Sequence, residues 1–220
     1  MIRSHDHITL KMYTSDDAHQ DEFDNYEILR TVKSSHPGRR HIRSALDRFE
    51  IQSPTGKEHH CLVQTPLWDS WRDLPQRNPI NRFTEDLLKA GLWELLVGLD
   101  HLHTECKLVH TGERHIYMYI NNLNLYINLP FTDIKADNIH SELNDKQLFE
   151  DFTRAELDTP TPRKCVDGFP VYLSRKFGLA RQSGCVVLSD FGSAVRGDSK
   201  RNHDAQPNVY RSPEVMLQVP

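Results

Sequence analysis

The stretch Asp133-Ile134-Lys135-Ala136-Asp137-Asn138 reads D-I-K-A-D-N and carries the residue types that phosphoryl transfer needs. That reaction requires a carboxylate that accepts the proton of the attacking hydroxyl, a cation near the transferred phosphate and oxygen ligands for Mg²⁺. Asp133, Lys135 and Asn138 can supply these groups in that order. The hexamer alone is a weak signal, because an Asp-rich turn that ends in Asn is usually a solvated loop.

Two further motifs follow this stretch along the chain. The run Cys185–Leu188 is apolar and indicates a short buried strand, and Ser189-Asp190-Phe191-Gly192 comes directly after it. The third motif is Tyr210-Arg211-Ser212-Pro213-Glu214. Because all three motifs occur in this order along the chain, chance is a poor explanation for D-I-K-A-D-N.

Together these motifs resemble the serine/threonine protein kinases of the SR-protein-kinase group. Leu102–Cys106, Val109-His110-Thr111 and D-I-K-A-D-N follow that group's pattern L-H-T-x-C…I-I-H-T-D-I-K-x-[DE]-N. The segment from Pro162-Arg163-Lys164 to Tyr172-Leu173-Ser174-Arg175 is also similar to members of the group. The resemblance covers nearly the whole chain and implies an α+β, bilobal protein-kinase-like fold.

The resemblance also implies roles for the motif residues. Asp133 would act as the catalytic base and Lys135 would stabilise charge on the phosphate. Asn138 and Asp190 would hold Mg²⁺, and ATP would be the phosphate donor. Glu214, in the S-P-E that replaces the family's A-P-E, would anchor the segment that begins at Asp190.

The N-terminal part supplies candidates for the nucleotide site. His7–Tyr13 is a predicted strand whose I-T-L-K resembles the V-A-I-K strand, so Lys11 would contact the α- and β-phosphates. Phe23, Tyr26 and Leu29 have helical spacing, and this predicted helix offers Glu22 as the best partner for Lys11, with Glu27 as the alternative.

The strand expected at His60–Gln64 leads into Thr65-Pro66-Leu67. By resemblance, backbone groups near Thr65 and Leu67 would bond adenine, and Gln64 would be the gatekeeper. We expect a short helix over Trp68–Arg77. A long core helix should then begin after an N-cap at Thr84, with leucines three or four residues apart from Leu88 to Leu102.

The expected domain organisation is a truncated kinase domain. Residues 1–65 would form part of the small lobe and residues 66–220 part of the large lobe, with a family-type insert over 139–184. No G-x-G-x-x-G precedes Lys11, and the chain stops soon after S-P-E. We therefore expect a small antiparallel-sheet lobe without its first strands. The mostly helical large lobe would lack its C-terminal helices, which leaves one face of the 88–102 helix uncovered.

Residues 112–132 interrupt the family pattern, because Asp133 should follow Thr111 directly. We hypothesise a translated intron: Gly112-Glu113 can be encoded by a splice-donor sequence, Thr132-Asp133 by a splice-acceptor end, and removal of 21 codons keeps the frame. The alternative is a real surface insertion. Closing such a loop costs roughly 2.7 kcal/mol, which a folded domain can tolerate.

Composition narrows the classes of partner. The formal net charge of −4 gives no basic footprint for direct nucleic-acid binding, and no apolar run suits a membrane span. Four cysteines without C-x-x-C spacing fit reduced thiols in the cytoplasm or nucleus. By resemblance the partners are ATP and protein substrates, including Arg/Ser-rich splicing factors. A catalytically inactive kinase-like binding module, or a non-functional fragment, is the alternative function.

Overall fold

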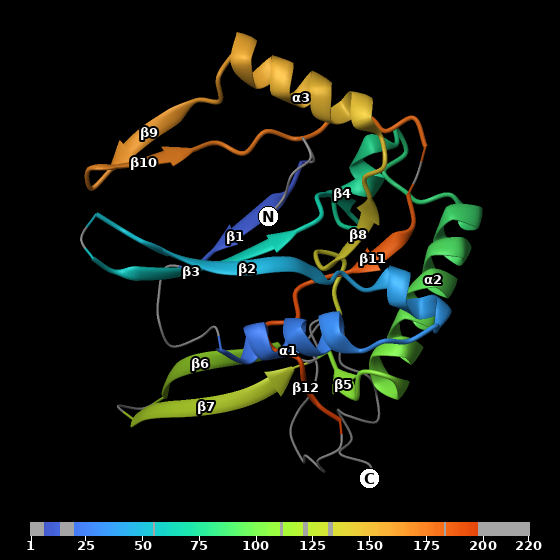
Figure 1. The fold of residues 1–220 in the computed structure, drawn as a ribbon, viewed down its shortest axis with the longest axis vertical. Helices are drawn as coiled ribbons and strands as arrows, with labels where there is room; N and C mark the ends of the chain where they lie inside the picture. The colour runs from blue at the N-terminus through green and yellow to red at the C-terminus, as the bar shows by residue number, and fades with distance from the viewer. Residues whose placement is uncertain are drawn as a thin grey trace.

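The computed structural model describes residues 7–13, 20–54, 56–110, 112–120, 123–131, 134–182 and 184–197, and for 112–131 it describes the backbone alone. Its first sheet contains β1 (Thr9–Met12), β3 (Glu58–Gln64) and β2 (Ala45–Gln52) in the order β1-β3-β2, all antiparallel (Figure 1). The strands predicted at His7–Tyr13 and His60–Gln64 are confirmed as β1 and β3.

Helix α1 (Gln20–Thr31) lies against this sheet. Its buried side chains include Phe23, Tyr26 and Leu29, whose spacing predicted the helix. The helix ends before Pro37, which begins a short 3₁₀ turn, η1 (Pro37–His41). Pro is suited to the first turn of a helix because its missing N–H would have no intrahelical partner there.

Turn η1 packs closely against helix α2 (Glu85–Thr104). A Cβ on Gly38 would lie 2.0 Å from the carbonyl oxygen of Val97, so only glycine permits this approach. The predicted N-cap of α2 is confirmed, because the Thr84 side chain accepts a hydrogen bond from the amide of Leu87.

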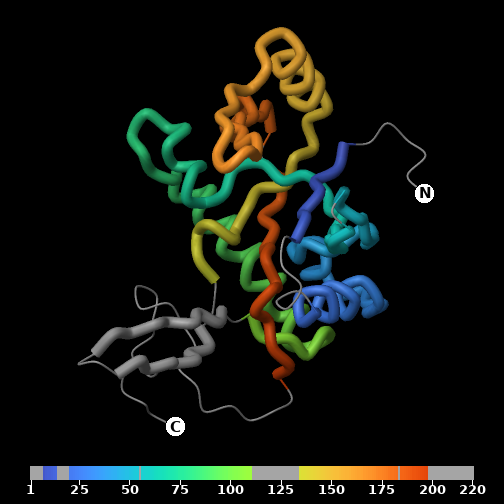
Figure 2. Tube along the Cα trace, turned by 90° about the vertical axis from the view of Figure 1, so that its left-hand side faces the viewer, coloured from blue at the N-terminus to red at the C-terminus, as the bar shows by residue number. Residues whose placement is uncertain are grey.

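Helix α2 has one packed face and one exposed face. The packed face carries Gly91, Leu95, Gly98 and Leu102, whereas Leu88, Leu92, Trp93 and Leu96 are exposed. The expectation of an uncovered face on this helix is confirmed. Strand β11 (Val186–Leu188) runs beside α2, as Figure 2 shows, and all three of its residues are buried as predicted.

A second antiparallel sheet has the order β11-β8-β4, where β4 spans Leu67–Ser70 and β8 spans Ile139–Glu142. The prediction of a helix over residues 68–77 is wrong. The first part is strand β4, whose side chains alternate between more and less buried positions, and the 3₁₀ turn η2 (Leu74–Arg77) follows. Pairing with β8 holds the first part of this segment as a strand, and the proline at position 75 disfavours a continuous helix through the second part.

The region between β8 and β11 forms a separate layer at one end of the molecule (Figure 1). It contains α3 (Lys146–Asp158) and the hairpin β9 (Arg163–Val166)–β10 (Phe169–Tyr172). The hairpin turns at Asp167 and Gly168, which both have a positive φ. We call residues 146–178 the insert segment.

Two further strand pairs complete the fold. Strand β5 (Leu108–Val109) pairs with β12 (Val195–Arg196), and β6 (Gly112–Ile120) pairs with β7 (Leu123–Phe131). Within the described ladders, β6 and β7 pair only with each other. The block that interrupts the kinase pattern therefore has the backbone of an antiparallel hairpin.

The buried core joins the two sheets. Its fully buried side chains include Phe191, Leu62, Leu102, Leu108 and Leu188, which come from β3, α2, β5, β11 and the loop that follows β11. Among the helices that the structure describes, none is long and apolar enough to cross a lipid bilayer.

Candidate nucleotide and phosphate site

Strand β1 and helix α1 bring Lys11 and Glu22 together. The Lys11 Nζ lies 2.7 Å from Glu22 Oε1, and the Glu22 side chain is buried. Glu27 instead faces solvent and pairs with Arg30 on its own helix. The structure therefore pairs Lys11 with Glu22 and not with Glu27.

The third charged group at this point is Asp190. Its Oδ1 lies 3.5 Å from Lys11 Nζ, and its side chain is about half exposed. Asp190 has a positive φ of 66°, which costs a non-glycine residue about 1–2 kcal/mol. The carboxylate that faces Lys11 is thus held in a conformation that most residues avoid.

Gly192 allows the segment after Asp190 to pass close to Glu22. A Cβ at this position would lie 3.3 Å from Glu22 Oε2, tighter than most such contacts. Phe191, which lies between Asp190 and Gly192 in the sequence, is fully buried and packs edge-on against Tyr26 and His110. The aromatic side chain therefore fixes the loop while the two acidic groups stay near Lys11.

Asn25 on α1 ties the helix to the same loop. Its Nδ2 donates hydrogen bonds of 2.9 Å to the Phe191 carbonyl and 2.8 Å to the Ala194 carbonyl. Sequence reasoning missed this residue. The available signal was a polar residue between Glu22 and Leu29 on the buried face of the predicted helix.

The D-I-K-A-D-N stretch contacts the Asp190 segment through Asn138. The backbone carbonyl of Asn138 accepts hydrogen bonds from the amide (2.9 Å) and hydroxyl (3.1 Å) of Ser189. The Asn138 amide in turn donates to the Lys135 carbonyl at 2.9 Å. Asn138 is buried, so the turn that carries Lys135 and Asn138 is anchored next to Asp190.

Asp133 lies outside the described residues, and so do residues 210–214. The predicted roles of Asp133 and Glu214 therefore stay predictions. Another residue of the same turn, Asp137, was not singled out from the sequence. Its Oδ1 accepts a hydrogen bond of 2.9 Å from Arg72, which joins the turn to the segment after β4.

Tyr13 lies at the end of β1 beside the charged cluster. Its ring is buried, and Lys11 Nζ lies 5.1 Å from the ring centroid. Burial, and then the neighbouring Glu22, raise the pKa of Tyr13 above its usual range. The phenol therefore stays neutral and adds no charge near Lys11.

Thr65 and Leu67 lie where the chain passes from β3 to β4. The Thr65 carbonyl accepts a 2.8 Å hydrogen bond from Arg43, and Leu67 pairs with Glu142 in the β4–β8 ladder. Both line a cavity of about 550 Å³ that Lys11 does not line. Contact of their backbones with adenine stays a prediction. Gln64, the predicted gatekeeper, is buried at the end of β3.

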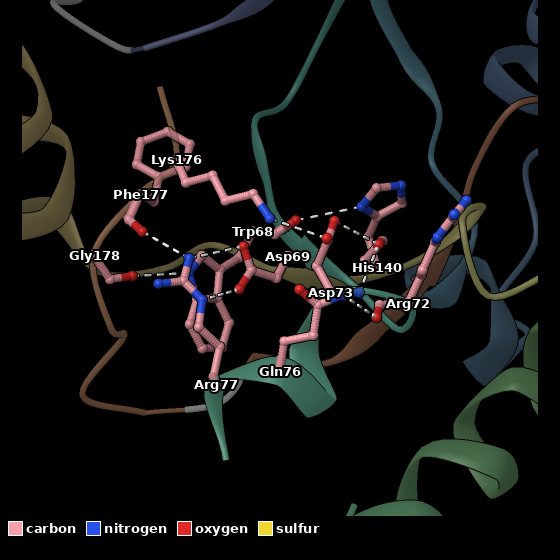
Figure 3. Close-up of polar contacts among 11 residues, drawn as sticks. Trp68, Asp69, Arg72, Asp73, Gln76, Arg77, His140, Lys176, Phe177 and Gly178 are labelled. Atoms are coloured by element: carbon pink, nitrogen blue, oxygen red, sulfur yellow. Dashed lines mark hydrogen bonds and ion pairs between the residues drawn. The ribbon is translucent and has the colours of Figure 1, made fainter. Parts of the chain in front are cut away.

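The segment that follows Leu67 is held by a dense polar network, shown in Figure 3. Arg77 Nε lies 2.5 Å from Asp69 Oδ2, and Arg77 Nη2 donates to the Phe177 carbonyl at 2.8 Å. Trp68 Nε1 donates to the Gly178 carbonyl at 3.1 Å, and Lys176 Nζ lies 3.0 Å from Asp73 Oδ1. The insert segment therefore packs on β4 and η2 through polar contacts that the sequence did not reveal.

Some known proteins resemble this chain in sequence, and a solved structure resembles it in fold. No family model matches the chain. A serine/threonine protein kinase of Aspergillus fumigatus is 31% identical over 221 residues, which cover 98% of this chain and 47% of that protein. The serine/threonine-protein kinase SRPK of Physarum polycephalum is 27% identical over 88% of this chain and 45% of its own length. The human SRSF protein kinase 3 is 30% identical over 40% of this chain and 16% of its own length.

A solved kinase domain has the same fold, with a TM-score of 0.60 and 20% sequence identity. The alignment covers all of this chain and 52% of that structure. The predicted α+β, protein-kinase-like fold is therefore confirmed. The chain spans about half the length of the curated relatives that it matches over nearly its whole length.

Proposed function

Because the chain has a protein-kinase fold and resembles serine/threonine protein kinases that include the SR-protein-kinase group, we propose that the protein transfers the γ-phosphate of ATP to serine or threonine hydroxyls of other proteins. One observation of the structure carries this proposal. Lys11 lies within 4 Å of two carboxylates, that of Glu22 on the next element, α1, and that of Asp190 from far along the chain.

The proposed role of Lys11 is to bind the α- and β-phosphates of ATP. A lysine is suited to this task as a point charge, and Glu22 fixes its ammonium in one place. Because Glu22 is buried and Lys11 is partly exposed, the ammonium can face a bound phosphate without losing its carboxylate partner.

The oxygen atoms near Lys11 also suit Mg²⁺, which prefers carboxylate and other oxygen ligands. Asp190 offers a half-exposed carboxylate, and Asn138 lies one hydrogen bond from the residue before it. We assign the Mg²⁺ contacts to these two side chains. When bound, Mg²⁺ neutralises charge on the β- and γ-phosphate oxygens.

The catalytic residues of the proposal are Asp133 and Lys135. Asp133 would accept the proton of the substrate hydroxyl, and Lys135 would lie near the transferred phosphate. The turn that holds Lys135 is anchored by Asn138 and by the Asp137–Arg72 ion pair, which support a fixed position for this cation. We further propose Arg/Ser-rich splicing factors as substrates, on the strength of similarity to proteins named as SRSF and SR-protein kinases.

The experiment that tests the proposal measures transfer of labelled phosphate from ATP to an Arg/Ser-rich peptide by the full-length protein without residues 112–132. We expect Asp190→Ala to abolish transfer, since it removes the Mg²⁺ ligand beside Lys11. Asp158→Ala, on the exposed end of α3, is the matched control and should leave the rate unchanged. Unchanged transfer by Asp190→Ala would rule out the assignment.

A second candidate function is a non-catalytic kinase-like module that binds ATP or a protein without transferring phosphate. The observation that favours it is the β6–β7 hairpin, which enters the chain between His110 and Ile134. Positioning errors of ~1 Å can lower a rate about 100-fold. Mg·ATP binding by the chain that retains the hairpin, together with no phosphate transfer, would support this function.

A further inference from the structure

The linker between α3 and β9 contains a polar cluster that the proposed function does not use. Thr161 donates two hydrogen bonds to Glu156, one from its amide to Oε1 at 2.7 Å and one from its hydroxyl to Oε2. Arg175 Nε donates to the same Oε2 at 2.7 Å, and its Nη2 donates to the Thr159 carbonyl. We call Glu156, Thr161 and Arg175 the latch.

The latch closes the base of the β9–β10 hairpin onto the end of α3. The Leu173 amide also donates to the Pro162 carbonyl at 2.9 Å, so both sides of the hairpin are joined where it begins. The Thr161 hydroxyl and amide, followed by Arg175, lower the pKa of Glu156 to about 2. Glu156 is therefore a full negative charge at physiological pH.

Arg175 connects the latch with the segment that borders β4. The next residues, Lys176, Phe177 and Gly178, make the polar contacts with Asp73, Arg77 and Trp68 that Figure 3 shows. The latch thus lies directly beside the residues that attach the insert segment to the rest of the fold.

The sequence of the linker is Thr159-Pro160-Thr161-Pro162, so two threonines are each followed by proline. Threonine before proline is the local pattern that proline-directed protein kinases modify. Proline also holds the preceding residue in an extended conformation, which suits entry into a kinase groove. Thr159 is exposed, whereas Thr161 is half-buried by its contacts with Glu156.

We propose that Thr161 is a phosphorylation site for a proline-directed protein kinase and that its modification opens the latch. In this step the Thr161 Oγ1 forms a bond to the γ-phosphorus of ATP, and the bond from that phosphorus to the β–γ bridging oxygen breaks. ADP leaves, and the hydroxyl proton passes to the base of the modifying kinase.

Phosphorylation changes the latch in two ways. The Thr161 oxygen loses the proton that it donates to Glu156, and a group of charge about −1.5 to −2 appears beside that carboxylate. Phosphate also offers three acceptor oxygens, which a guanidinium can bind through two hydrogen bonds. Arg175 therefore moves from Glu156 to the phosphate, and Glu156 is released from the linker.

The closed latch and the modification compete for the same oxygen, so the closed latch slows phosphorylation of Thr161. Removal of the Glu156 carboxylate frees the Thr161 hydroxyl. Phosphorylation of Thr161 should then be about tenfold faster, the ratio typical of one hydrogen bond. Glu150 is exposed on the same helix and gives a matched control.

The test treats the full-length protein with a purified proline-directed kinase and Mg·ATP, and locates phosphate by peptide mass spectrometry. All proteins carry Asp190→Ala, so that transfer by the chain itself plays no part and the outcome does not depend on the proposed function. We expect phosphate on Thr161, about tenfold faster in Glu156→Ala and unchanged in Glu150→Ala. The proposal would be overturned if Thr161 carried no phosphate in the protein with Glu156 and none in Glu156→Ala. Equal rates of phosphorylation in these two proteins would also overturn it.

Amide hydrogen exchange tests the opening of the latch. The Thr159 amide donates to the Ala155 carbonyl in the last turn of α3. Exchange of residues 157–159 should become faster after stoichiometric phosphorylation, and faster to a similar extent in unmodified Glu156→Ala. Thr159→Val should not prevent either change. Exchange that stays the same after complete phosphorylation of Thr161 would contradict the opening of the latch.

Discussion

The ammonium of Lys11 lies 2.7 Å from the buried carboxylate of Glu22. This ion pair joins β1 to α1, and the Asp190 carboxylate at 3.5 Å adds the segment after β11. Two consecutive elements and a segment far along the chain therefore meet at one cation.

Replacement of Lys11 by methionine should lower the free energy of unfolding. Glu22 would remain buried without the cation that neutralises it, and loss of a buried hydrogen-bond partner costs about 1–3 kcal/mol. Urea unfolding followed by circular dichroism measures the change. Glu27→Gln, on the exposed face of the same helix, should change it by less than about 0.5 kcal/mol. Equal effects of the two substitutions would contradict the ion pair.

Asn25→Ala should destabilise the protein by about 1–3 kcal/mol, because two buried carbonyls lose their donor. The loop at Phe191 should also become less protected, which hydrogen exchange of residues 191–194 can measure. Asp24→Ala changes an exposed neighbour and is the control. If exchange in the loop is the same in both variants, Asn25 does not anchor it.

Stability should fall as the pH is lowered from about 7 towards 5, partly through His101. Burial, and then the nearby His36, lower the pKa of His101, while Glu105 opposes this shift. The unfolded chain therefore takes up a proton near pH 6.5 before the folded chain does, so the stabilisation is present above that pH and lost below it.

The free energy of unfolding measured across this pH range should have a shallower slope in His101→Gln, by up to about 1.4 kcal/mol per pH unit. His140, whose pKa is also lowered by burial, leaves a residual slope of the same sign. The exposed His103 gives a control substitution that keeps the slope of the parent protein. An identical slope in His101→Gln would refute the assignment.

Deletion of residues 112–132 should leave the fold intact, since β6 and β7 form ladder pairs only with each other among the described strands. Removal of the loop-closure cost should raise stability by up to roughly 2.7 kcal/mol. Cooperative thermal unfolding of the deletion variant measures this. Loss of cooperative unfolding would show that the hairpin supports the rest of the chain.

Sequencing the transcript across the codons for Thr111 and Asp133 separates the two explanations of the hairpin. Absence of the 21 codons from the mature message would identify a retained intron and join His110-Thr111 to Asp133. Their presence would identify a real insertion, and the catalytic proposal would then depend on the split loop.

Local patterns in the sequence were enough to predict several elements of the fold. The spacing of Phe23, Tyr26 and Leu29 gave α1, the apolar run at 186–188 gave β11, and Thr84 gave the start of α2. These features depend on neighbours in the chain, which is why periodicity and capping reveal them.

Features that depend on distant partners could not be predicted in this way. The sequence favoured Glu22 over Glu27 as the partner of Lys11, and the structure, which shows the face of α1 that meets β1, settled the choice. Strand β4 was mistaken for a helix because its partner β8 lies about 70 residues further on. Asn25 and Arg77 bond carbonyls 166 and 100 residues away, so no local pattern shows their role.

The measurement that tests the central claim most directly is thermal unfolding of the chain with and without Mg·ATP, for the parent protein and for Asp190→Asn. At a ligand concentration of about 100 Kd, binding to the Lys11–Glu22–Asp190 site should stabilise the parent protein by about 2.7 kcal/mol. The variant should lose most of this stabilisation. No shift of the parent protein at millimolar Mg·ATP, or an equal shift in Asp190→Asn, would contradict a nucleotide site at Lys11.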